Sequence, residues 1–498
     1  MAVTSGLSLS PDAGVRSTHS PWALSGPLLL GLVVFVWLAN LKGVPLLGDP
    51  DTHWHITVGN WILQHQNVPT VDSYSFTFTG QPWIAKEWLS QVILASAYDA
   101  GGWGGVVVLG AAALAASFAL MFRLLLRDLK PLPALLFTGA AIAMTAPHFL
   151  SRPHVLAFLF MLWWVAGLVR AVEERRAPDP FLLIAMLFWA NLHGGFTLGL
   201  VLAGALGLDA LVGACDAAER RALFFGWAKF GVGSLVAACV TPYGPESILV
   251  TLRIFGLGDA LSAISEWKSP NFQEIPTQEV ILLVAAYLAL SRGLKVPLIR
   301  LLIVIGLLHL FLRYVRNAEL LAMLAPLVLA PVLTRQWPSL RPDAEPKGRF
   351  SALARPAGPA STFTAVALIA LYGAGLVRFG GIEPPKSTAP TAALEFVREA
   401  GIKGNVFNHY GYGGFLIGAG IPTFIDGRGE LFGGDFIKQY VQAVNLRGDE
   451  PLEALLDRYN IAWTFLAKDQ PANRLLAHLP GWRQAYSDDQ AVIFVRDR

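Results

Sequence analysis

The chain has 498 residues, of which 54% are hydrophobic and only 15% are charged, and its mean hydropathy is +0.50. Soluble domains carry about 25% charged residues, so this chain has too few charges for a surface that faces water on all sides. Its net charge of +3 gives no support for nucleic-acid binding. The only two cysteines, Cys215 and Cys239, exclude a cysteine-based metal site, and we expect them to remain unbridged.

Long apolar runs predict a mainly α-helical, polytopic membrane protein, because each is of the order needed to cross about 30 Å of hydrocarbon. The first run follows a polar tail, residues 1–20, and is too long for the apolar core of a signal peptide, so we interpret it as a retained span. About eleven spans are expected, at residues 22–41, 103–122, 131–147, 154–170, 181–191, 196–214, 223–241, 279–291, 298–312, 318–333 and 360–377.

Positive charges alternate between the loops that join these spans. The loop that carries Arg123, Arg127 and Lys130 is basic, as is every second loop after it, whereas the opposite loops contain few cations. The positive-inside rule places the basic loops in the cytoplasm. We therefore predict a cytoplasmic tail at 1–20, a membrane domain at 21–378 with a long first outer loop at 42–102, and an extracytoplasmic domain at 379–498.

The C-terminal segment, 379–498, is predicted to be a small soluble α/β domain. Helices are expected at 391–400, 412–420, 451–459 and 472–479, and strands at 405–407, 423–425, 461–466, 483–486 and 491–495. Helices that alternate with short apolar strands favour a mostly parallel sheet covered by helices. The glycine-rich stretches match neither a dinucleotide-binding nor a P-loop pattern, so we expect no nucleotide cofactor and no redox cofactor.

The first outer loop opens with acidic and histidine residues. The stretch Gly48–His55 contains Asp49, Asp51, His53 and His55, and a short interfacial helix is expected directly after it, at 56–64. A carboxylate at this position can accept a proton from a hydroxyl group, can bind Mg²⁺ or Mn²⁺ together with its neighbour, or can cap the following helix. The three possibilities remain open at this point.

Other outer segments contain cations on the side of the membrane where the charge rule expects few. An arginine at such a depth is costly unless it is paired, and is then usually functional. Guanidinium groups match phosphate oxygens, although Arg152 and Arg313 could instead form structural ion pairs with Asp49, Asp51 or Glu87. The residues expected to bind substrate are His53, His55, Glu87, Arg152, His154, Asn191, His193, Lys268, Arg313 and Arg316. The histidines lack the spacing of a zinc motif.

Together these groups indicate an amphiphilic substrate. Its lipid tail would lie between helices, its phosphate on Arg or Lys, and its polar head near Asp51. Transfer of that head group needs a base and charge stabilisation of the departing phosphate. Two other classes of protein fit the same features, namely a flippase or transporter of lipid-linked glycans and a non-catalytic envelope glycan assembly protein.

The chain resembles the GT-C superfamily of integral-membrane glycosyltransferases over most of its length, in the bacterial form that depends on a polyprenyl-phosphate-linked sugar. The resemblance rests on Asp49-Pro50-Asp51 through His55, at the start of a long outer loop with two interfacial helices. It also rests on Glu87-Trp88-Leu89, Arg152-Pro153, Asn191-x-His193-Gly194 and Asp426-Gly427-Arg428. No counterpart of the acceptor-recognition motif of oligosaccharyltransferases is present, which disfavours N-glycosylation of sequons.

The resemblance implies an inverting hexosyl or pentosyl transferase in the bacterial inner membrane. Asp51 would be the general base, with Asp49 as the second candidate. The partners would be the polyprenyl-phosphate-sugar donor, a glycan, lipid or protein acceptor on the outer face, and membrane lipids. Some members use a divalent metal and others do not, so Mg²⁺ or Mn²⁺ bound by Asp49 and Asp51 stays open.

Overall fold

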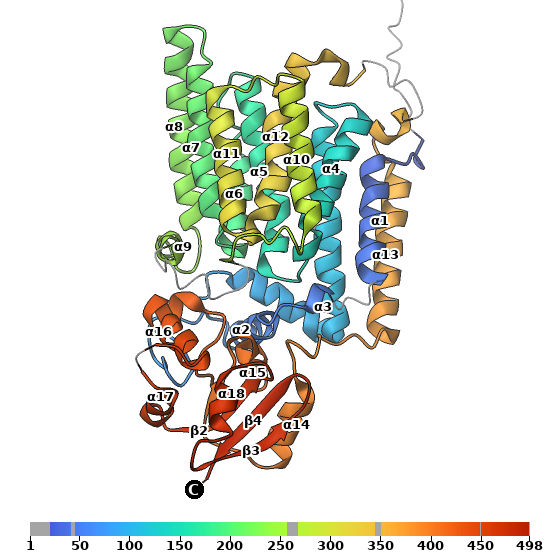
Figure 1. Ribbon diagram of the computed structural model, residues 1–498. Helices are drawn as coiled ribbons and strands as arrows, with labels where there is room; N and C mark the ends of the chain where they lie inside the picture. The colour runs from blue at the N-terminus through green and yellow to red at the C-terminus, as the bar shows by residue number, and fades with distance from the viewer. Residues whose placement is uncertain (1–19, 41–44, 256–266, 344–349, 449, 498) are drawn as a thin grey trace, which may run out of the picture.

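The computed structural model describes residues 20–40, 45–255, 267–343, 350–448 and 450–497. The expected cytoplasmic tail lies outside these ranges except for its last residue. Figure 1 shows a long helical bundle and a smaller C-terminal domain, with the first outer loop lying between them.

A helix covers each of the eleven apolar runs that were predicted as spans. These helices are α1 (Gly26–Asn40), α3 (Trp88–Leu125), α4 (Pro131–Thr145), α5 (Pro153–Glu173), α6 (Leu182–Leu192), α7 (Phe196–Val212), α8 (Ala217–Cys239), α10 (Pro276–Ser291), α11 (Leu298–Arg313), α12 (Ala318–Gln336) and α13 (Pro359–Phe379). Among the described residues, five segments are long and apolar enough to cross a membrane, namely α3, α5, α8, α13 and the stretch Val315–Gln336 that contains α12. The protein is an integral membrane protein, while the number of eleven crossings stays a prediction.

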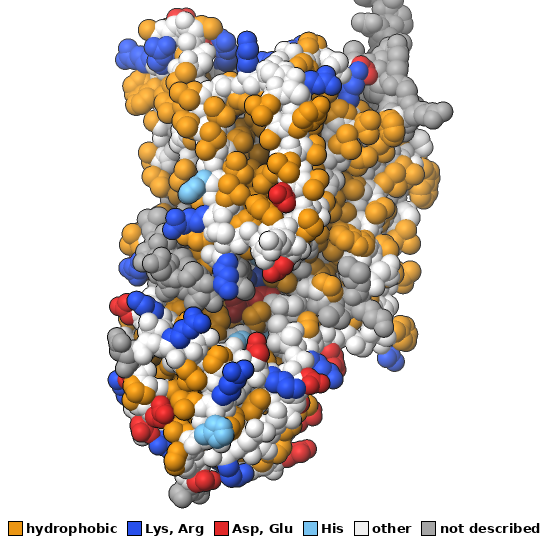
Figure 2. Space-filling view, viewed as in Figure 1, with side chains coloured by type: hydrophobic (Ala, Val, Ile, Leu, Met, Phe, Trp, Pro, Cys, Tyr) orange, Lys and Arg blue, Asp and Glu red, His pale blue; other side chains and the backbone are white. Residues whose placement is uncertain are grey.

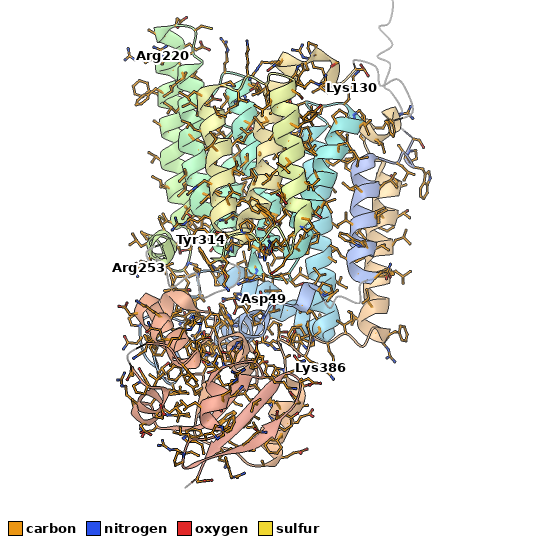
Figure 3. The ribbon with its side chains drawn as sticks, viewed as in Figure 1. Asp49, Lys130, Arg220, Arg253, Tyr314 and Lys386 are labelled. Carbon is orange, nitrogen blue, oxygen red and sulfur yellow. The ribbon has the colours of Figure 1, made fainter. Side chains whose placement is uncertain are left out.

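The helices of the bundle differ in how much of their surface is buried, and many hydrophobic side chains are exposed. The apolar window of α12 is 78% buried, whereas that of α13 is 17% buried, which suits a helix at the lipid boundary. Figure 2 shows a broad hydrophobic area across the face of the bundle in view, with Lys and Arg side chains gathered at the end farthest from the C-terminal domain. Lys130 and Arg220 mark that end in Figure 3.

A buried ionic cluster ties the helices together toward the same end. The side chain of Arg300 is 2% exposed, and its Nε donates to Asp209 at 2.8 Å while its Nη2 donates to Glu173. A buried guanidinium is tolerated only where carboxylates compensate its charge. The cluster therefore stabilises the packing of α5, α7 and α11.

The first outer loop lies on the opposite end of the bundle and contains the two expected interfacial helices. The helix expected at 56–64 is α2, which spans Thr52–His65, and the second is the beginning of α3 at Trp88. The second helix turns into the membrane span at Gly101 and Gly102, whose backbone angles are not helical. The loop thus places Asp49 and Asp51 directly before α2.

The C-terminal domain contains most of the expected elements. They are α14 (Thr391–Glu399), β1 (Asn405–Asn408), α15 (Gly413–Gly418), α17 (Leu452–Arg458), β2 (Ile461–Ala467), α18 (Ala472–Leu476), β3 (Trp482–Ser487) and β4 (Ala491–Arg496). The domain also contains α16 (Gly429–Val444), a helix that was not expected. The remaining helical elements of the chain are α9 (Glu246–Phe255) and short 3₁₀ turns at Pro45–Leu47, Ala146–His148, Val315–Asn317, Pro338–Leu340, Ser351–Ala354 and Tyr410–Tyr412.

The prediction of a mostly parallel sheet is wrong. The strand order is β1-β2-β4-β3, and only β1 and β2 pair in parallel, while β4 pairs antiparallel with both of its neighbours. Strands β3 and β4 form a hairpin whose turn is held by Asp488, which accepts the N–H groups of Gln490 and Ala491 at 2.7 Å. The expected strand at 423–425 is also wrong, because Thr423 makes only an isolated bridge to Ser75.

Candidate active site

The end of the bundle next to the C-terminal domain, the first outer loop and that domain line a cavity of about 990 Å³. Figure 3 places Asp49 at the junction of these three parts. The predicted site residues that line the cavity are Asp49, Asp51, His55, Glu87, Arg152, His154, His193, Lys268 and Arg316. Residues that are far apart in the sequence, from the first outer loop to the segment around Arg316, therefore meet at one place.

Arg152 joins both carboxylates of the Asp-x-Asp stretch. Its Nε lies 2.6 Å from Asp49 Oδ2, and its Nη2 lies 2.9 Å from Asp51 Oδ2. Asp49 is 2% exposed and its Oδ1 accepts the backbone N–H of Asp51 at 3.0 Å. The ion pair considered as an alternative for Arg152 is thus present. The described helix α2 has no side-chain capping bond from Asp51, so the capping alternative is wrong for that residue.

Glu87 lies between two histidines. Its Oε1 is 3.6 Å from His193 Nε2, and its Oε2 is 3.9 Å from His55 Nε2. The backbone N–H of Gly195 donates to His193 Nδ1 at 3.1 Å, so a neutral His193 carries its hydrogen on Nε2, toward Glu87. Burial lowers the pKa of His55 well below its usual value, and the positive charges of Arg152 and Lys86 lower it further. His55 is therefore neutral at physiological pH.

Lys86 forms an ion pair that connects the first outer loop with the C-terminal domain. Its Nζ donates to Glu430 Oε1 at 2.7 Å, and both side chains line the cavity. Burial alone would raise the pKa of Glu430, but the adjacent Lys86 charge outweighs it, so that the pKa is lowered. Burial also raises the pKa of Glu87, and the charges of Lys86 and Arg152 offset this only in part.

A second, fully buried cluster holds the C-terminal domain in place. Arg428 donates to both oxygens of Asp426 at 2.7 Å and to Asp72 of the first outer loop, and none of the three side chains is more than 1% exposed. The guanidinium also lies 5.3 Å from the ring of Tyr74 and 4.9 Å from that of Trp83. The stretch Asp426-Gly427-Arg428 therefore fastens the domain to the outer loop, with Gly427 lining the cavity.

Cations from the far wall complete the site. Arg316 lies 4.7 Å from the ring of Trp267, and the carbonyl of Lys268 accepts the N–H of Val315, which holds these two segments side by side. His154 Nε2 lies 3.6 Å from Glu319 Oε1. The wall thus presents both basic and acidic groups to the cavity.

Three predicted residues do not line this cavity in the described part of the chain. Asn191 bonds to the indole of Trp88 at 2.7 Å and to the carbonyl of Val240 at 2.9 Å, which joins three helices of the bundle. The ring of His53 contacts Trp103 and Phe415. Arg313 donates to the hydroxyl of Tyr314 at 2.9 Å.

Several polar residues that line the cavity were not among the predicted site residues, and they include Lys86, Glu319, His409 and Glu430. Lys86 directly precedes Glu87, and Glu319 follows the cationic stretch at 313–316, so both carried a weak local signal. His409 and Glu430 belong to the C-terminal domain and had none. Burial lowers the pKa of His409 to about 4.

The acidic residues do not fit a divalent cation. Within the described ranges, no group of three His, Cys, Asp or Glu side chains is arranged to hold a metal ion. The guanidinium of Arg152 bridges Asp49 and Asp51, and so occupies the position that a cation shared by those carboxylates would take. We therefore assign no step to Mg²⁺ or Mn²⁺.

Comparison with solved structures finds a protein of similar fold. The crystal structure of ArnT from Cupriavidus metallidurans in the apo state superposes with a TM-score of 0.50 at 14% identity, over 93% of this chain and 97% of that chain. The same protein bound to undecaprenyl phosphate gives a TM-score of 0.48 at 14% identity over the same shares of the two chains. No protein-family model and no curated protein sequence matches the chain.

A third structure is the archaeal oligosaccharyltransferase AglB from Archaeoglobus fulgidus, in complex with an inhibitory peptide and a dolichol-phosphate. It gives a TM-score of 0.49 at 9% identity, over 89% of this chain and 69% of that chain. At such identities the likeness to ArnT establishes the fold, and the activity has to be argued from the site.

Proposed function

We propose that the protein is a membrane glycosyltransferase that moves a sugar from a polyprenyl-phosphate-linked donor to an acceptor at the outer face of the bacterial cytoplasmic membrane. The observation that carries this proposal is a single cavity that combines paired carboxylates, several cations and an apolar wall. An amphiphile would fit these three surfaces, with its lipid tail on the apolar wall, its phosphate on the cations and its polar head near the carboxylates.

The apolar wall belongs to the outer ends of the bundle helices. It is formed by Ala157, Phe158, Met161, Leu198, Val201 and Leu310. A polyprenyl tail would lie along these side chains, and each buried methylene group would contribute about 0.8 kcal/mol. The donor phosphate would then meet the cations Lys86, Arg152, Lys268 and Arg316.

Asp51 is the proposed general base. It is the more exposed of the two aspartates, with 15% of its side chain accessible against 2% for Asp49, and Arg152 fixes its orientation. The acceptor hydroxyl would give its proton to Asp51 while its oxygen attacks the sugar carbon from the side opposite the phosphate, which inverts that carbon. The cations would stabilise the negative charge that develops on the departing phosphate.

The two alternative classes are less well supported. A transporter would need polar groups that lead to the other side of the membrane, whereas the carboxylates and cations that line the cavity come from loops and from the helix ends next to them. A non-catalytic assembly protein would not need a pair of carboxylates that line a cavity of this size.

Glycan analysis in the native bacterium tests the proposal without knowledge of the sugar. A deletion strain is complemented with the wild type, with Asp51→Asn or with Asp435→Asn, an exposed carboxylate on α16 that serves as the control. Mass spectrometry of envelope glycans should show one sugar missing in the deletion and Asp51→Asn strains and restored in the other two. Full restoration by a normally inserted Asp51→Asn protein would remove Asp51 from the mechanism.

A further inference from the structure

We propose that Glu87 is a second catalytic carboxyl group, which donates a proton to the departing lipid phosphate while Asp51 accepts the proton of the acceptor. The inference rests on the proposed sugar transfer and assigns a further residue to it.

The position of Glu87 suits contact with the donor phosphate. It immediately precedes α3, its side chain is 13% exposed, and it lines the same cavity as Lys86 and Arg152. Oε1 lies 3.6 Å from His193 Nε2, which is beyond hydrogen-bond distance. His55 Nε2 is 3.9 Å from Oε2, too far for a hydrogen bond, so Oε2 is free of that ring and can carry a proton toward the cavity.

Two carboxyl groups near Lys86, those of Glu430 and Glu87, have surroundings that shift their pKa values in opposite directions. The positive charge of Lys86 compensates the negative charge of Glu430 through a direct ion pair, which keeps Glu430 ionised. Among the described residues, Glu87 makes no ion pair of that length, and burial raises its pKa. Adjacent acids whose environments drive their pKa values apart are a recurring feature of acid–base catalysis. The ionisable groups that face Glu87 are His55, Lys86, Arg152, His193, Arg316 and Glu430.

A phosphate bound by Lys86 and Arg152 would reinforce this protonation. An ionised Glu87 beside it would repel the phosphate, whereas a protonated Glu87 can donate a hydrogen bond to it. Binding of the donor therefore favours the form of Glu87 that the reaction needs.

The proposed step balances in atoms and charge. The acceptor oxygen forms a bond to the sugar carbon, and the bond from that carbon to the phosphate oxygen breaks with its electron pair left on the oxygen. The acceptor proton passes to the Asp51 carboxylate, and the Glu87 carboxyl proton passes to the phosphate oxygen. Asp51 then releases its proton to water and Glu87 regains one from water, which restores both groups.

Binding of farnesyl phosphate to the purified full-length protein tests the role of Glu87 without a sugar. Isothermal titration calorimetry from about pH 5.5 to about pH 9 is compared between the wild type, Glu87→Gln and the exposed control Glu399→Gln. Gln is a neutral donor of similar shape, so the affinity of the wild type relative to Glu87→Gln should fall by up to about tenfold per pH unit above the pKa of Glu87. Titration of farnesyl phosphate itself cancels in this ratio.

The outcomes separate the two proposals. Binding with the same pH dependence in the wild type and Glu87→Gln overturns the role of Glu87 and leaves the transferase proposal intact. Failure of the wild type to bind farnesyl phosphate overturns both. If Glu87→Gln does not fold, infrared spectroscopy of the wild type replaces it. A buried carboxylic acid C=O band should then disappear as the pH rises and shift when farnesyl phosphate binds, and its absence overturns the inference.

Discussion

The carboxylate of Asp51 lies directly against Gly427, so that a methyl group on this glycine would come within 1.9 Å of Asp51 Oδ1. The nearest atoms belong to the end of the Asp51 side chain, which can rotate, rather than to backbone. Because Arg152 lies on the other side of the carboxylate, Asp51 is held between the bundle and the C-terminal domain. The C-terminal domain thus helps to set the orientation of the proposed base.

Gly427→Ala should displace the Asp51 carboxylate without unfolding the protein. We expect sugar transfer to fall by about 100-fold, since a misplacement of about 1 Å can cost that much, while the melting temperature changes little. Gly375→Ala on α13 is the matched control, because nothing lies within 4 Å of its added methyl group. Wild-type transfer by Gly427→Ala would contradict the role of this contact.

Arg428→Met should loosen the C-terminal domain. Removal of the guanidinium leaves Asp72 and Asp426 buried without their shared cation, which should cost about 3–5 kcal/mol. Limited proteolysis should then release the C-terminal domain faster than in the wild type. Arg458→Met, whose side chain is 53% exposed in its ion pair with Glu450, should change stability by no more than about 1 kcal/mol.

Stability should fall in mild acid because of His53. Burial lowers its pKa from 6.5 to about 4 in the folded protein. The unfolded chain therefore binds more protons between these values, so stability is full above about pH 6.5 and is lost as the pH falls toward about 4, by up to about 3 kcal/mol. Melting temperatures of the wild type and His53→Phe measured over this range should diverge as the pH falls. Parallel curves would be inconsistent with a His53 that is neutral in the folded protein.

A chelator should leave sugar transfer unchanged. Arg152 already supplies the positive charge between Asp49 and Asp51, whereas Arg152→Ala should reduce transfer by about 100-fold or more, through loss of charge stabilisation at the phosphate. Initial rates of sugar transfer, measured with and without EDTA, test the prediction for the chelator. Inhibition by EDTA that Mn²⁺ reverses would show that a metal does take part.

The positions of the membrane helices could be predicted from the sequence because apolar runs of that length have few alternatives in a bilayer. The direction of the strands could not be predicted from the sequence. Short apolar runs such as 491–495 look the same in parallel and antiparallel pairs, and the hairpin depends on the side chain of Asp488. Helix α16 was missed because three glycines lie in its first half, where Gly433 takes a non-helical conformation.

The candidate site could be predicted only in part. Asp51, Glu87 and Arg152 were visible as charges in outer loops, but which of them pair depends on tertiary packing. The Lys86–Glu430 ion pair joins residues 344 positions apart, and no local pattern announces such a contact. The residues contributed by the C-terminal domain therefore became apparent only in the folded structure.

The most direct test of the central claim is sugar transfer by the purified protein in proteoliposomes. Polyprenyl-phosphate donors that carry different radiolabelled sugars are supplied together with an extract of envelope acceptors, and the label that leaves the lipid is counted for the wild type and Asp51→Asn. We predict that the wild type transfers one of these sugars and releases polyprenyl phosphate, and that Asp51→Asn does not. Label that stays on the lipid with every donor, or equal transfer by Asp51→Asn, would contradict the account.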